Sequence, residues 1–211
     1  MPETIDKSKR VIDFYVKANQ NKYKISKKDK IRDYSVAEMT VMAALDALFR
    51  HEYLGPEDKD YDVNKVIRTI FADSLRGQID DLSKKEEYEQ LLDNTVHNET
   101  EEAMMAKTSY FNTFIGYNSD NKDLNELLKN FDKLRETKRI GHVLWDAKGD
   151  RLESVLEHIY GTIVLIMGIE SEWGYEIDYN KIIQMLLIHE TEEILKGDEP
   201  DLHVPHDQEL G

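Results

Sequence analysis

The segment MLLIHETEEILKGDEP, residues 185–200, joins an apolar run to a histidine and several carboxylates. His189 and Glu190 are adjacent, Glu193 shares a helix face with His189, and Asp198 lies just beyond. Imidazole and carboxylate groups are the ligands that divalent first-row metals accept. The segment is therefore a candidate metal centre. The alternative is that the histidine is a hydrogen-bonded core residue and that ETEE is a solvated helix end.

A second histidine strengthens the candidate. His158 lies early in a helix predicted over 151–171, and His189 lies late in a helix predicted over 178–196. A short turn around SEWGYEI joins the two helices, so they should form an antiparallel pair with both imidazoles at one end. A cation there could lower the pKa of a bound water and polarise a phosphoryl oxygen, and Glu193 could then handle the proton.

The elements that must position these groups are helices. Apolar residues recur with helical periodicity over 9–23, 35–52, 62–76, 84–93, 99–116, 123–135, 151–171 and 178–196. Glycine (10) and proline (4) are scarce, which disfavours a fold with many tight turns. We predict an all-α protein and expect no strand.

An internal repeat suggests two related halves. YSVAEMTVMAALDAL aligns with ESVLEHIYGTIVLIM, and YDVNKVIRTIFADSL aligns with IDYNKIIQMLLIHET. Met39 stands in the first copy where His158 stands in the second, so the first copy lacks the candidate ligands. GYNSDNKD marks a boundary. We expect a half without metal ligands over 1–118 and a half with the His/Glu motif over 123–211; chance similarity of amphipathic helices is the alternative.

Composition narrows the partners and the compartment. The formal net charge is −15, and a surface this acidic disfavours a nucleic-acid polymer as partner. A small phosphorylated ligand stays compatible if a bound cation inverts the local field. The chain has no cysteine, so a metal must use histidine and carboxylate ligands. No apolar run is long enough to span a membrane, and we expect a cytoplasmic protein.

The motifs RLESVLEHIYG and LLIHETEEILKGDEP resemble those of the HD-domain metal-dependent phosphohydrolases, in particular the 5′-deoxynucleotidase-like branch. The resemblance implies an HD-domain-like helical bundle, which the repeat would make two degenerate HD-like halves. It implies that His158, His189 and Glu190 are ligands of a divalent metal, which could be Mn, Co, Fe, Ni, Zn or Mg.

The same resemblance assigns the remaining site residues. Glu193 and Asp198 would be catalytic or would contact the substrate. The upstream segment KLRETKRIG looks like the family's basic entry segment, so Arg139 would meet the substrate phosphate. His142, close to that phosphate end, is a further candidate for a substrate contact. The implied reaction is hydrolysis of a (deoxy)nucleoside 5′-monophosphate to nucleoside and phosphate.

Departures from the family pattern keep a second function open. Glu190 replaces the aspartate of the family's His-Asp doublet, and the family's last aspartate ligand has no counterpart after Asp198. The fourth protein ligand is therefore missing unless Asp207, His203 or His206 of the tail folds back or another subunit of a homodimer supplies one, and we expect the tail residues to be solvated. The alternative is a non-catalytic HD-like module that binds a nucleotide or a protein through the same pocket.

Overall fold

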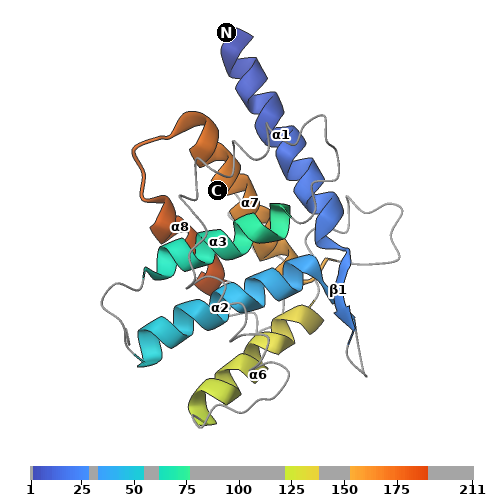
Figure 1. The fold of residues 1–211 in the computed structure, drawn as a ribbon, viewed down its shortest axis with the longest axis vertical. Coiled ribbons are helices and arrows are strands. Elements are labelled where there is room, and N and C mark those ends of the chain that lie inside the picture. Colours follow the sequence, from blue (N-terminus) through green and yellow to red (C-terminus); the bar gives the residue numbers. More distant parts are fainter. Residues whose placement is uncertain (1, 29–32, 55–61, 77–121, 138–152, 190–211) are drawn as a thin grey trace, which may run out of the picture.

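The structure is a computed structural model, and it describes residues 2–28, 33–54, 62–76, 122–137 and 153–189. In chain order its elements are α1 (Pro2–Lys22), β1 (Ile25–Lys28), β2 (Asp33–Ser35), α2 (Val36–Leu54), α3 (Val63–Arg76), α6 (Lys122–Glu136), α7 (Val155–Trp173) and α8 (Tyr179–His189). The described part is mostly helical, which confirms the predicted all-α class (Figure 1). The helices expected over 84–93 and 99–116 lie outside the described residues.

The expectation of no strand is wrong. β1 and β2 form a short antiparallel pair, with Ile25 opposite Ser35 and Lys28 opposite Asp33, and an irregularity follows Ile25. The sequence here is lysine-rich and shows no apolar alternation, which is why periodicity did not reveal it. The pairing comes from backbone hydrogen bonds, and Val36 N–H adds one beside the strands by donating to the Lys24 carbonyl at 2.8 Å.

Helix α2 is the central element of the core. Its residues from Val36 to Leu48 are all buried, because α3, α7 and other elements contact it on several sides. A helix that is apolar around its circumference is typical of such a central position. One buried hydroxyl of α2 finds its hydrogen-bond partner within the same helix: Thr40 Oγ1 donates to the Val36 carbonyl at 2.7 Å.

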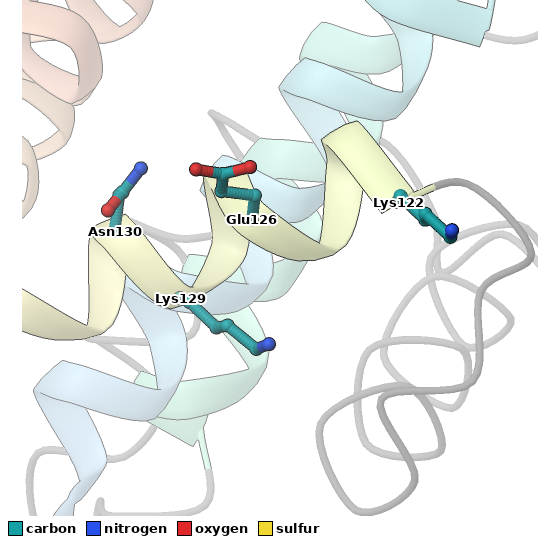
Figure 2. A pocket seen from close by; sticks show the side chains of 4 residues that line it. All are labelled: Lys122, Glu126, Lys129 and Asn130. Atoms are coloured by element: carbon teal, nitrogen blue, oxygen red, sulfur yellow. The ribbon is translucent and has the colours of Figure 1, made fainter.

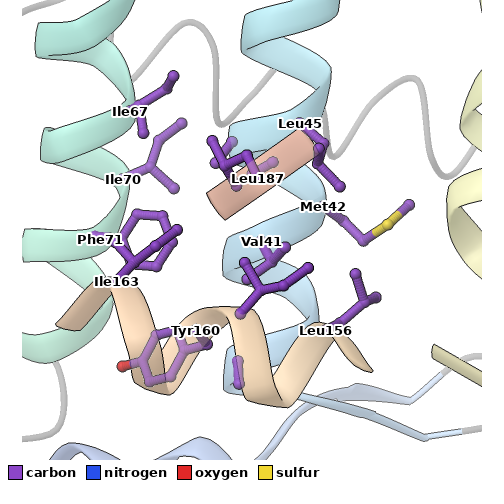
Figure 3. Packing of buried hydrophobic residues seen from close by; sticks show 14 of the residues in the cluster. Val41, Met42, Leu45, Ile67, Ile70, Phe71, Leu156, Tyr160, Ile163 and Leu187 are labelled. Carbon is purple, nitrogen blue, oxygen red and sulfur yellow. The ribbon is translucent and has the colours of Figure 1, made fainter. Parts of the chain in front are cut away.

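Side chains from four helices meet in one hydrophobic core (Figure 3). Leu45 of α2, Ile67 of α3, Tyr160 of α7 and Leu187 of α8 all belong to this core, and none is more than 1 % exposed. Phe71 stacks on Tyr160 with ring centroids 5.7 Å apart. Elements on either side of the predicted boundary therefore share a core. The division into two HD-like halves over 1–118 and 123–211 stays a prediction.

Helix α1 packs closely on α7 because α7 carries glycine at the contact. A Cβ at Gly168 would lie 3.4 Å from side-chain carbons of both Val11 and Phe14. At the far end of this contact Arg10 donates two hydrogen bonds to the carboxylate of Glu172, at 2.6 and 2.8 Å. The pair combines small-residue packing with a bidentate ion pair between segments far apart in sequence.

Among the described helices, none combines the length and the apolarity needed to cross a membrane.

Tyr160 gives the core a measurable pH dependence. Burial raises the pKa of its hydroxyl to about 12 from 10.0, and the side-chain contact with Ser74 opposes this shift only in part. Because the folded pKa lies above the unfolded one, the neutral tyrosine stabilises the fold fully below pH 10, and this stability is lost as the pH rises toward 12. We predict that the free energy of unfolding falls by about 2–3 kcal/mol more across this window in the wild type than in Tyr160→Phe. Urea titrations at pH 9 to 12 measure the free energy of unfolding of both proteins. The same dependence of this free energy on pH in both would contradict the prediction.

Candidate functional site

Of the predicted site residues, the structure describes His158 and His189. His158 lies in the first turns of α7 and is half-buried, and His189 is the last residue of α8 and is exposed. The other five, Arg139, His142, Glu190, Glu193 and Asp198, lie outside the described residues. Within the described part no three histidines or carboxylates are grouped as they would be around a metal ion. The complete ligand set therefore stays a prediction.

The start of α7 is fixed by a capping box, which positions His158. Ser154 is the N-cap: its side chain accepts a hydrogen bond from Glu157 N–H at 3.2 Å, and Glu157 Oε2 accepts from Ser154 N–H at 3.0 Å. His158 N–H then makes the first helical bond, to the Ser154 carbonyl at 3.0 Å. The motif Ser-Val-Leu-Glu-His thus sets both the first residue of the helix and the height of the imidazole along it.

A second capping box lies at the start of α2, and the two are joined. Ser35 N–H donates to Glu38 Oε2 at 2.9 Å, and Glu38 N–H donates to Ser35 Oγ at 3.2 Å. The other carboxylate oxygen of Glu38 accepts a hydrogen bond from Ser154 Oγ at 3.2 Å. These serine and glutamate residues are buried, so the hydrogen bonds replace hydration that the carboxylates lose.

Cations lie close to the residues that precede both capping serines. Lys22 Nζ, on a side chain only 5 % exposed, lies 2.7 Å from Glu153 Oε1. The guanidinium of Arg135 lies 4.8 Å from the centre of the Tyr34 ring. None of these four residues was predicted from the sequence. Tyr34 and Glu153 each precede a Ser-Val-x-Glu motif directly, whereas Lys22 and Arg135 lie far from the motifs in sequence and gave no signal.

The connection between α7 and α8 is a tight turn. Gly174 adopts φ 54° and donates its N–H to the Glu170 carbonyl at 2.8 Å, which ends α7 in the left-handed conformation that glycine favours. Tyr175 N–H then donates to the Tyr179 hydroxyl at 3.1 Å, and Asp178 accepts from Lys181 N–H at the start of α8. The turn returns α8 against α7, as the short connection predicted.

A separate cavity of about 490 Å³ lies along α6, lined by Lys122, Glu126, Lys129 and Asn130. In Figure 2 Glu126 and Asn130 point to one side of the helix, whereas Lys122 and Lys129 point elsewhere. These side chains do not converge on a common point, and none belongs to the predicted site. The cavity therefore does not replace the His158 and His189 region as the candidate.

The capping contacts generate a stability prediction. Ser154→Ala removes the acceptor for Glu157 N–H and also the donor to Glu38, whereas Ser35→Ala removes only the acceptor for Glu38 N–H among the hydrogen bonds described above. We expect Ser154→Ala to lower the free energy of unfolding by about 2–3 kcal/mol and Ser35→Ala by about 1 kcal/mol. Urea unfolding of both variants makes the comparison. An equal loss in the two would show that the contact with Glu38 contributes nothing.

Comparison with known proteins places the site region beside a known family. No curated protein and no solved structure matches the chain. The family model described as HD domain matches residues 131–209, a range that contains all seven predicted site residues together with α7 and α8. This part of the chain is therefore similar to the HD-domain family.

Proposed function

We propose that this protein is a metal-dependent phosphohydrolase that removes phosphate from a small phosphomonoester, a (deoxy)nucleoside 5′-monophosphate. The observation that carries the proposal is the HD-domain match over residues 131–209, because HD domains are in general metal-dependent phosphohydrolases. The nucleotide substrate rests on the resemblance of the two histidine motifs to the 5′-deoxynucleotidase-like branch. The expected products are the nucleoside and inorganic phosphate.

The donor chemistry of the predicted ligand set fits a divalent first-row cation. His158 and His189 offer imidazole nitrogens, and Glu190 offers a carboxylate. A cation held by these three would supply Lewis-acid stabilisation to the phosphoryl oxygens. The capping box at Ser154 supports the proposal, because it fixes the first turn of the helix that carries His158.

Other residues of the matched range would act on the substrate. Arg139 would hold the phosphate, since a guanidinium pairs with two phosphate oxygens at once, and His142 would add a further contact. Glu193 would orient the attacking water and accept its proton, and Asp198 would assist at the same end of the site. The net charge of −15 opposes the approach of a phosphate, and a local cation such as the bound metal would offset that repulsion.

The alternative proposal is a non-catalytic HD-like module that binds a nucleotide or a protein through the same region. The observation that favours it is the replacement of the family's His-Asp doublet by His189-Glu190. The longer glutamate side chain shifts the position of its carboxylate, and metal catalysis depends on ligand geometry.

Metal content and phosphate release separate the two proposals. We predict that the purified full chain contains a divalent metal and releases phosphate from deoxynucleoside 5′-monophosphates when Mn²⁺ or Co²⁺ is supplied. His158→Ala and His189→Ala should each lower metal content and reduce the rate by about 100-fold or more, because each removes a ligand. Metal analysis and a phosphate-release assay provide the measurements.

The matched control is His97→Ala, since His97 belongs to neither histidine motif and should leave metal and rate unchanged. Binding of a nucleotide without turnover, in protein loaded with metal, would favour the module over the enzyme. Metal content unchanged in both His158→Ala and His189→Ala would remove the proposed site.

A further inference from the structure

The described helices form two sets of three whose first helices contact corresponding partners, although α1 packs on α7 more extensively than α6 packs on α2. In the first set α1 precedes α2 and α3, and in the second α6 precedes α7 and α8. Helix α1 packs on α2 of its own set and on α7 of the other, while α6 packs on α7 of its own set and on α2 of the other. In Figure 1 α1 and α7 lie together at the top, α2 and α6 lie together at the bottom, and α2 and α7 start close together.

The starts of the middle helices correspond residue by residue. Ser35 and Glu38 form the capping box of α2, and Ser154 and Glu157 form that of α7. The two boxes touch through the hydrogen bond from Ser154 Oγ to Glu38. Equivalent ends of the two helices therefore meet, as they must where a two-fold axis passes between them.

The cation beside each capping box comes from the other set of helices. Lys22, the last residue of α1, pairs with Glu153, the residue before the capping serine of α7. Arg135, near the end of α6, lies over Tyr34, the residue before the capping serine of α2. Each set thus supplies a cation from the end of its first helix to the same position in the other set.

Helices α3 and α8 exchange a reciprocal pair of side-chain hydrogen bonds. Gln184 of α8 donates to Asn64 Oδ1 of α3 at 2.8 Å, and Arg68 of α3 donates to Asn180 Oδ1 of α8 at 2.6 Å. Each asparagine lies two residues after the aspartate that precedes its helix, and each donor lies four residues after an asparagine. Contact of position i with j and of j with i is the signature of an interface between like units.

We infer that α1–α2–α3 and α6–α7–α8 are two copies of one three-helix unit, packed about an internal two-fold axis. The first unit occupies the place that a second subunit would take in a dimer of the second unit. The surface that each unit presents is therefore built to bind another copy of the same unit. Of the candidate metal ligands, His158 has Met39 as its counterpart in the first unit, so the two related ends differ in chemistry.

The two-fold axis predicts where a second copy of the Arg68–Glu170 ion pair could be built. Arg68 also donates to both carboxylate oxygens of Glu170, at 2.6 and 3.1 Å. The axis relates Arg68 to Gln184, and it relates Glu170 to His51, because each is the sixteenth residue after its capping serine. A full chain with Gln184→Arg and His51→Glu should therefore rebuild the same pair on the opposite side of the axis.

The experiment is urea unfolding of the full-length variants. We expect Gln184→Arg to lower the unfolding midpoint, and His51→Glu to lower it in the wild-type background, because each introduces a lone charge in a half-buried position. Added to Gln184→Arg, His51→Glu should raise the midpoint, whereas the uncharged control His51→Gln should not. If the midpoint of the double variant falls by the sum of the two single losses, the proposed two-fold axis is wrong.

A second measurement does not depend on buried substitutions. The chain has no cysteine, so pairs of introduced cysteines can carry spin labels at chosen sites. The axis relates Lys65 to Lys181 and Asp73 to His189, each at the same distance in sequence from its helix-capping aspartate. The distance between labels at Lys65 and His189 should equal that between labels at Asp73 and Lys181, measured by electron paramagnetic resonance without metal. Clearly different distances would refute the inference, and neither readout involves phosphatase activity.

Discussion

The contact between the N-termini of α2 and α7 is the constraint on which the described structure depends. A buried glutamate must lose its hydration, and Glu38 replaces it with hydrogen bonds from its own helix start and from Ser154. The hydrogen bond from Ser154 therefore holds the starts of the two helices together. Once these starting points are fixed, the direction of α2 determines how it packs on α3, and the direction of α7 determines the height of His158.

The helical class and most helix positions followed from the sequence because burial imposes periodicity. Residues such as Val66, Ile70 and Phe71 repeat with the spacing of a helix face that packs on the core. The strands β1 and β2 could not be found in this way, since they are short, polar and held by backbone bonds. The ion pair of Lys22 with Glu153 was equally hidden, because its partners are far apart in sequence.

The candidate site is less completely predictable for a different physical reason. A metal site requires several donors to converge to within tenths of an ångström, and residue spacing within one helix cannot specify how two helices meet. His158 and His189 were placed on adjacent helices by sequence alone, and the structure has α7 and α8 in contact. Glu190, Glu193 and Asp198 lie outside the described residues, so their positions relative to the two histidines stay a prediction.

The close packing of α1 on α7 has a consequence for how the chain folds during synthesis. Lys7 donates to the carbonyl of Glu172, 165 residues later, and Arg10 binds the same residue's carboxylate. A ribosome releases α1 long before α7 has been synthesised. Until then the apolar face of α1 that carries Val11 and Phe14 lacks the helix that covers it in the folded protein. Contacts of such long sequence separation slow folding, and they make α1 a segment that a chaperone could shield during translation.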